Sequence, residues 1–154
     1  YYAIGVNRET DIDTDTTAEN DFTQWIETID KTKPVFVISH RPLHERRDDN
    51  DNANDWYDVI NQAATSTDIV FLWGHNHYGE NDVDRNAYYV SKDGDDTFPL
   101  DGGKTANPNF TYANAGYFNG TTEFGKEIKR RGIVTVAEVT DDSIILQDYC
   151  ATGT

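Results

Sequence analysis

The chain has 154 residues, which is enough for one domain whose hydrophobic core needs no disulfide support. A formal net charge of −15, from 28 acidic and 13 basic residues, repels phosphate backbones and argues against general nucleic-acid binding. A single cysteine, Cys150, excludes an intrachain disulfide framework and a thiolate zinc site, and no apolar run approaches the roughly 20 residues that span a bilayer. The 9 Tyr, 7 Phe and 3 Trp residues predict one globular domain over residues 1–154.

The first predicted elements are a strand and a helix. Residues 1–6 predict a strand, and a chain that opens inside a strand is expected to be a piece excised from a longer protein. Thr16 stands three residues before Glu19, which is the capping-box signal for a helix start. Four apolar residues follow at the spacing of one helix face: Phe22, Trp25, Ile26 and Ile29. Pro34 is expected to end this helix.

Two continuous apolar runs of strand length come next. Residues 35–38 and 69–73 predict strands buried on both faces of a sheet, and residues 45–55 predict an exposed loop between them. A second set of side chains has helical spacing: Trp56, Val59, Ile60 and Ala63. Strand, helix and strand in this order form a βαβ unit with parallel strands. Ligand sites in such sheets collect beyond the carboxyl ends of the strands.

The rest of the chain predicts mostly antiparallel β structure. Strands are expected over residues 87–91, 110–113, 132–139 and 143–149. The last two are joined by the polar residues 140–142 as a hairpin, and residues 93–109 predict a loop. The fold class is therefore α/β, with the helices in the first half.

All four histidines lie just after the two apolar strands. His40 and His44 follow the first strand, and His75 and His77 follow the second, after Gly74. Neutral imidazole is a common metal ligand, and residues two positions apart on an extended chain, such as His75 and His77, point to the same side. Gly74 is expected to let the backbone bend at the strand end. These positions predict a metal site at one edge of the sheet.

The two motifs resemble those of the calcineurin-like metallophosphoesterases. The first apolar strand ends in His-x-Pro, with His40 and Pro42. The second apolar strand follows about 30 residues later and ends in Gly-His-x-His. Residues 112–116, Tyr-Ala-Asn-Ala-Gly, resemble the short strand and turn that follow in that family, and residues 22–26 resemble its preceding helix. The resemblance implies the C-terminal portion of a four-layer αββα sandwich, with mixed sheets and flanking helices.

The resemblance also implies a site with two metal ions. His40 and His75 would bind one ion and His77 the other, with Fe, Mn and Zn all acceptable to imidazole ligands. A water bridging the metals would attack the phosphorus of a phosphate ester. His44 is the candidate catalytic residue, suited to protonating the leaving group. Arg41 and Asn76 are the candidate substrate-binding residues, Arg41 through its guanidinium fork.

The family's N-terminal motifs are missing from this sequence. Asp-x-His, Gly-Asp-x-x-Asp and Gly-Asn-His-Asp/Glu do not occur, so the bridging carboxylate, the Asn ligand and the usual acid–base His must come from elsewhere. The expected partner is the missing N-terminal half of the domain. The chain alone is expected to be a poor catalyst.

Two other functions remain open from the residues alone. One is a mononuclear zinc hydrolase with His40, His75 and His77 as a three-His site. The other is a non-catalytic binding module that keeps the fold. The acidic, nearly cysteine-free composition slightly favours a bacterial extracellular or cell-surface protein.

Overall fold

The parallel sheet predicted from the apolar runs is the centre of the fold. The computed structural model describes residues 1–6, 17–44, 53–74, 90–92, 94, 96–100, 104–117, 122–123, 126–127 and 130–152. Its main sheet has the strand order β1-β2-β3-β6, with β1 Tyr2–Val6, β2 Val35–Ser39, β3 Ile69–Trp73 and β6 Thr111–Asn114. Helix α1 spans Thr17–Ile26 and helix α2 spans Ala53–Ala63. The predicted mixed α/β class with a parallel βαβ unit is confirmed.

All four strands of this sheet run parallel and end at the same level. The register pairs Val6 with Ser39, Ser39 with Trp73, and Trp73 with Asn114. The last residues of the four strands therefore form one row, called here the carboxyl edge. Any side chain that follows one of these strands starts from this edge.

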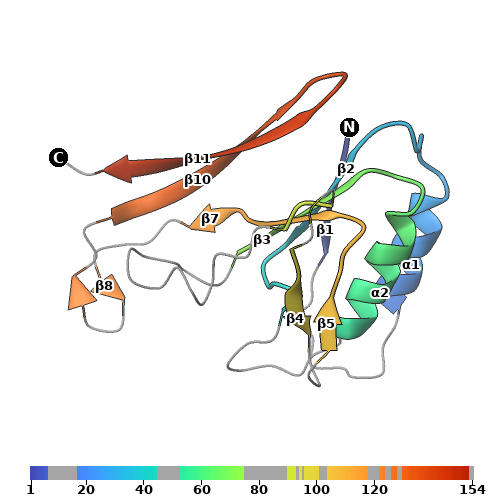
Figure 1. Cartoon of the computed structure of the whole chain (residues 1–154), viewed down its shortest axis with the longest axis horizontal. Helices are drawn as coiled ribbons and strands as arrows, with labels where there is room; N and C mark the ends of the chain where they lie inside the picture. The colour runs from blue at the N-terminus through green and yellow to red at the C-terminus, as the bar shows by residue number, and fades with distance from the viewer. Residues whose placement is uncertain are drawn as a thin grey trace.

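Both helices pack on one face of the sheet, where their apolar stripes are buried (Figure 1). Phe22 and Ile26 of α1 and Trp56 and Ile60 of α2 are at most 3% exposed, as the helical spacing predicts. The Phe22 and Trp56 rings meet with centroids 6.0 Å apart, which joins the two helices. Burying one such side chain contributes about 1.5–3 kcal/mol. The helices are therefore held by packing more than by their intrinsic propensity.

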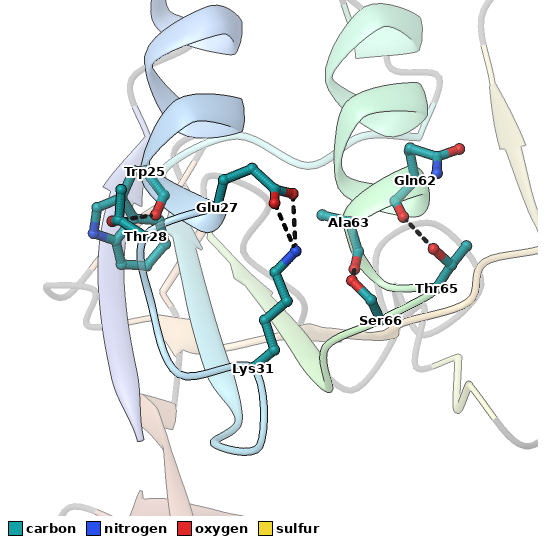
Figure 2. Close-up of polar contacts among 8 residues, drawn as sticks. All are labelled: Trp25, Glu27, Thr28, Lys31, Gln62, Ala63, Thr65 and Ser66. Atoms are coloured by element: carbon teal, nitrogen blue, oxygen red, sulfur yellow. Dashed lines mark hydrogen bonds and ion pairs between the residues drawn. The ribbon is translucent and has the colours of Figure 1, made fainter.

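Helix α1 ends earlier than the sequence predicts. It stops at Ile26, well before Pro34, because the Thr28 hydroxyl donates to the carbonyl of Trp25 at 2.7 Å and the Thr28 N–H donates to the same oxygen at 2.9 Å (Figure 2). These bonds satisfy a carbonyl that the helix leaves without a partner at its end. Ile29 therefore lies outside the helix, although it still packs against the core.

Helix α2 also ends with hydroxyl side chains that donate to backbone carbonyls of its last turn. The Thr65 hydroxyl donates to the carbonyl of Gln62 at 2.7 Å, and the Ser66 hydroxyl donates to the carbonyl of Ala63 at 3.3 Å (Figure 2). The helix begins at Ala53, so the exposed loop predicted over residues 45–55 overlaps its first turn. At 10 and 11 residues, neither helix in the described ranges is long and apolar enough to cross a membrane.

The second face of the sheet is less covered than predicted. On β2, Phe36 is 6% exposed but Ile38 is 47% exposed, so the prediction that this strand is buried on both faces is wrong at Ile38. Val70 of β3 on the same face is 4% exposed. This face is thus apolar along its length and open to solvent near the carboxyl edge.

Two predictions for the middle of the chain are wrong. Strand β6 was expected among antiparallel strands, yet it is the fourth parallel strand, beside β3. The loop expected over residues 93–109 contains a two-stranded ribbon of β4 Phe98–Leu100 and β5 Lys104–Ala106. Its apolar residues Phe98 and Leu100 are buried in the core. Val90 forms a bridge with Tyr112, and residues 87–89 of the strand predicted over residues 87–91 lie outside the described residues.

The predicted C-terminal hairpin is confirmed and belongs to a second sheet. Its order is β11-β10-β7, with β10 Arg130–Val139, β11 Ile144–Thr152 and β7 Gly116–Tyr117. A short separate pair joins β8 Thr122–Glu123 to β9 Lys126–Glu127. Figure 1 shows the hairpin, in orange and red, apart from the two helices. The Thr135 hydroxyl donates to the Asn114 carbonyl at 3.3 Å and so connects β10 to the end of β6.

Replacing Ile60, which is fully buried, by Ala should destabilise the fold by about 2–5 kcal/mol, because it leaves a cavity between α2 and the sheet. The matched control is Ile145→Ala, since Ile145 is 50% exposed, and it should cost about 1 kcal/mol or less. Urea denaturation followed by tryptophan fluorescence measures both. Equal losses for the two variants would contradict this placement of the core.

Candidate functional site at the carboxyl edge

The two histidine motifs start from neighbouring strands. His40 directly follows β2 and Gly74 directly follows β3, and the Gly74 N–H donates to the His40 carbonyl at 3.1 Å. On the other side of β3, the Ala115 N–H donates to the Trp73 carbonyl at 2.7 Å. Strand pairing therefore continues past the ends of the strands and fixes the backbone at His40 and Gly74.

The structure describes half of the predicted site residues. His40 is exposed at the end of β2. Arg41 is half-buried, and its backbone N–H donates to the hydroxyl of the buried Ser39 at 3.2 Å. His75, Asn76 and His77 lie outside the described residues. Their roles as metal ligands and as a substrate contact stay predictions.

His44 lies inside the core and is only 3% exposed. Its ring meets that of Trp73 edge to face, with centroids 4.8 Å apart. Its Nδ1 atom is 2.7 Å from the hydroxyl oxygen of Tyr112. His44 is thus held by two residues of neighbouring strands, β3 and β6. Its predicted contact with substrate stays a prediction.

Tyr112 is the residue of this site that the sequence analysis did not assign to it. Its ring is fully buried and stacks on Phe98, with centroids 4.3 Å apart, and on Trp73, with centroids 5.5 Å apart. Its hydroxyl reaches the turn after His40, where it accepts the Leu43 N–H at 2.8 Å. A tyrosine in an apolar strand is a signal in the sequence, because a buried phenol needs a hydrogen-bond partner. The sequence does not name the partner.

Among the described residues, His40 is the one that could bind a metal ion. His40 offers an exposed imidazole, a ligand type that suits Zn, Fe and Mn. The end of β6 adds Asn114, which is 7% exposed. Within the ranges the structure describes, no three His, Cys, Asp or Glu side chains come together as a metal-binding group. The chemistry and position of His40 fit a ligand role that needs further ligands from other parts of the protein.

A cleft elsewhere in the molecule does not belong to this edge. Its volume is about 350 Å³, and it lies between α1 and α2 with Phe22, Ile26 and Val59 among its lining residues. Thr65 and Ser66 also line it, and they precede the first residue of β3. The cleft therefore lies at the opposite edge of the sheet from His40.

Two side chains with displaced pKa values also lie away from the carboxyl edge. Hydrogen bonds from the hydroxyl and the backbone N–H of Thr32 lower the pKa of the exposed Asp30 carboxyl, just before β2. Burial raises the pKa of Tyr57 on α2, although its hydroxyl donates to the Asn107 carbonyl at 3.2 Å. Both shifts have structural causes and do not mark a reactive site.

Gly74→Ala should be tolerated, because among the described residues a Cβ at this position would meet only the His40 carbonyl, at an ordinary 3.5 Å. The bend that the sequence analysis assigned to this glycine therefore needs no glycine on steric grounds. The expected change in the free energy of unfolding is about 1 kcal/mol or less, and chemical denaturation measures it. Gly5→Ala is the matched control, since no atom of the part of the chain that the structure describes lies within 4 Å of its added Cβ. A loss well above that of the control would show that a glycine is required.

Searches with family models, among curated proteins and among solved structures each returned no match to this chain. The resemblance to metallophosphoesterases therefore depends on the two histidine motifs, their spacing and the Asn-Ala-Gly segment that begins with the last residue of β6.

Proposed function

We propose that the chain is the C-terminal part of a metal-dependent phosphoesterase of the calcineurin-like type. In this proposal His40, His75 and His77 bind two transition-metal ions at the carboxyl edge, and residues outside this sequence complete the site. The substrate is a phosphate ester. The isolated chain is then a poor catalyst, because it lacks the bridging carboxylate and the remaining ligands.

One observation carries the proposal. The backbone bond between the His40 carbonyl and the Gly74 N–H joins the starting points of the two histidine motifs at 3.1 Å. His75 is covalently bonded to Gly74 in the sequence. The carboxyl end of a parallel sheet is also the usual position of a ligand site in α/β proteins. The motifs recognised from their spacing thus start from the same edge, as one metal site requires.

The residues of the chain have separate roles in the proposed reaction. His40, exposed at the end of β2, donates a ring lone pair to a metal. Arg41 contacts a phosphoryl oxygen through its guanidinium group, and Asn76 contacts the substrate through its amide. When bound, two transition-metal ions neutralise phosphoryl charge and lower the pKa of an attacking water. A protein with a net charge of −15 repels a phosphate ester, and the positive charge of the bound metal ions would offset this repulsion at the site.

The same proposal includes a four-layer αββα sandwich in the complete domain. The helices cover one face of the parallel sheet, while the other face carries Phe36, Val70 and the half-exposed Ile38. The β10–β11 hairpin carries exposed apolar side chains of its own at Val136 and Ile145. Apolar residues on both surfaces support a second sheet packed against the first, with the missing N-terminal half adding strands to it.

Metal binding is the first test of the function. The purified chain should bind Mn²⁺ or Zn²⁺, and His40→Ala and His75→Ala should each weaken binding by about tenfold or more, because each removes an imidazole ligand. Elemental mass spectrometry after gel filtration gives the stoichiometry, and calorimetry gives the affinity. Asp141→Asn, at the hairpin turn far along the chain, is the control and should leave binding unchanged. Unaltered affinity in both histidine variants would contradict the proposed ligands.

Hydrolysis is the second test, made with the full-length gene product. It should cleave p-nitrophenyl phosphate or bis-p-nitrophenyl phosphate, lose activity in chelator and regain it with added metal. One metal per chain with no phosphate-ester hydrolysis would favour the three-His zinc hydrolase. Absence of any metal binding would favour the non-catalytic module.

A further inference from the structure

Three hydrogen-bond contacts to the Tyr112 hydroxyl group come from the turn that follows His40. The backbone N–H groups of Leu43 and His44 lie 2.8 Å and 3.4 Å from the hydroxyl oxygen. The third contact is His44 Nδ1 at 2.7 Å. The partners lie 68 and 69 positions before Tyr112, so this one oxygen ties β6 to the chain that leaves β2.

The chemistry of the three partners decides where the protons are. A backbone N–H can only donate, so the phenol oxygen accepts from both backbone groups with its two lone pairs. The hydroxyl has one proton of its own, and His44 Nδ1 is at a short distance for receiving it. A proton on Nδ1 would instead place a third donor against an oxygen that already accepts two hydrogen bonds. The neutral imidazole of His44 must then carry its proton on the other ring nitrogen, Nε2.

We infer that Tyr112 is a positioning residue that holds His44 as the neutral Nε2–H tautomer and fixes the turn after His40. In this state His44 can donate a hydrogen bond from Nε2, but it cannot bind a metal through either ring nitrogen. Nδ1 is occupied by the Tyr112 hydroxyl, and Nε2 carries a proton. Of the two histidines after β2, His40 is therefore the one left for a metal.

The same contacts position His40. The turn is held at its far end by Tyr112 and at its near end by the Arg41 N–H bond to Ser39 and by the bond between His40 and Gly74. Tyr112 is itself fixed by stacking on Trp73, the last residue of β3. The ends of β2, β3 and β6 are thus connected through side chains as well as through strand pairing.

The experiment is nitrogen NMR of the imidazole rings in the whole ¹⁵N-labelled chain, at mildly alkaline pH where free imidazole is neutral. The chain has four histidines, and the signals of His44 are those missing from His44→Gln. We expect a pyridine-type Nδ1 and a pyrrole-type Nε2 for His44. A pyrrole-type Nδ1, or two protonated nitrogens, would overturn the inference.

Variants and metal addition separate this inference from the proposed function. Tyr112→Phe should move the His44 Nδ1 signal toward the pyrrole-type position, because both tautomers become populated. Tyr2→Phe, which removes a hydroxyl that accepts the Asp30 N–H at 3.3 Å, should leave the signal in place. If Tyr112→Phe fails to fold, the wild-type spectrum still decides the tautomer.

Adding Zn²⁺ tests the part that rests on the proposed function. The His40 signals should shift while the His44 pattern persists. Loss of the His44 pattern with zinc would overturn the inference, because His44 would then be a ligand. Unchanged signals for all four histidines would contradict the proposed metal site but leave the tautomer established by the wild-type spectrum.

Discussion

The parallel pairing of β2 with β3, in a register that aligns their last residues, is the constraint on which the other features of the fold depend. The crossover through α2 makes the two strands parallel, and the pairing of Ser39 with Trp73 brings their ends to one level. A shift of one residue would turn Phe71 and Trp73 away from the helices, because successive strand residues face opposite sides. It would also separate His40 from Gly74, whose backbone bond joins the two motifs. The same register thus serves the core and the candidate site.

The elements of the first half could be predicted because their signals are local. The run over residues 69–73 is entirely apolar and forms β3 with the predicted bounds, and the spacing of Trp56 and Ile60 marks the buried face of α2. Strand β6 was placed wrongly because Thr111–Asn114 has no such run, and its partner strand lies about 40 positions earlier. The ribbon of β4 and β5 lies between Gly-, Asp- and Pro-containing segments that are typical of a loop.

The candidate site could be predicted only in part. The position of His40 at a strand end follows from the sequence, since an apolar run stops just before it. The burial of His44 does not follow, because it depends on Tyr112 and Trp73, which approach only once β3 and β6 are paired. A histidine four residues after a predicted ligand has the same local sequence whether it faces a substrate or the core. Packing against residues far along the chain decides between these two environments, and the residues next to His44 in the sequence do not indicate that packing.

The β10–β11 hairpin has a consequence for how the molecule opens. Its strands pair with each other from Val134 with Tyr149 to Val139 with Ile144, whereas only Ile133 and Val134 pair with β7. Apolar side chains such as Val136 and Ile145 remain in contact with solvent. Local openings of a protein begin where backbone hydrogen bonds lie close to solvent, and the described part of this hairpin has that character. We therefore expect its amide hydrogens to exchange with solvent through a local opening, and those of β2 and β3 to exchange only through global unfolding.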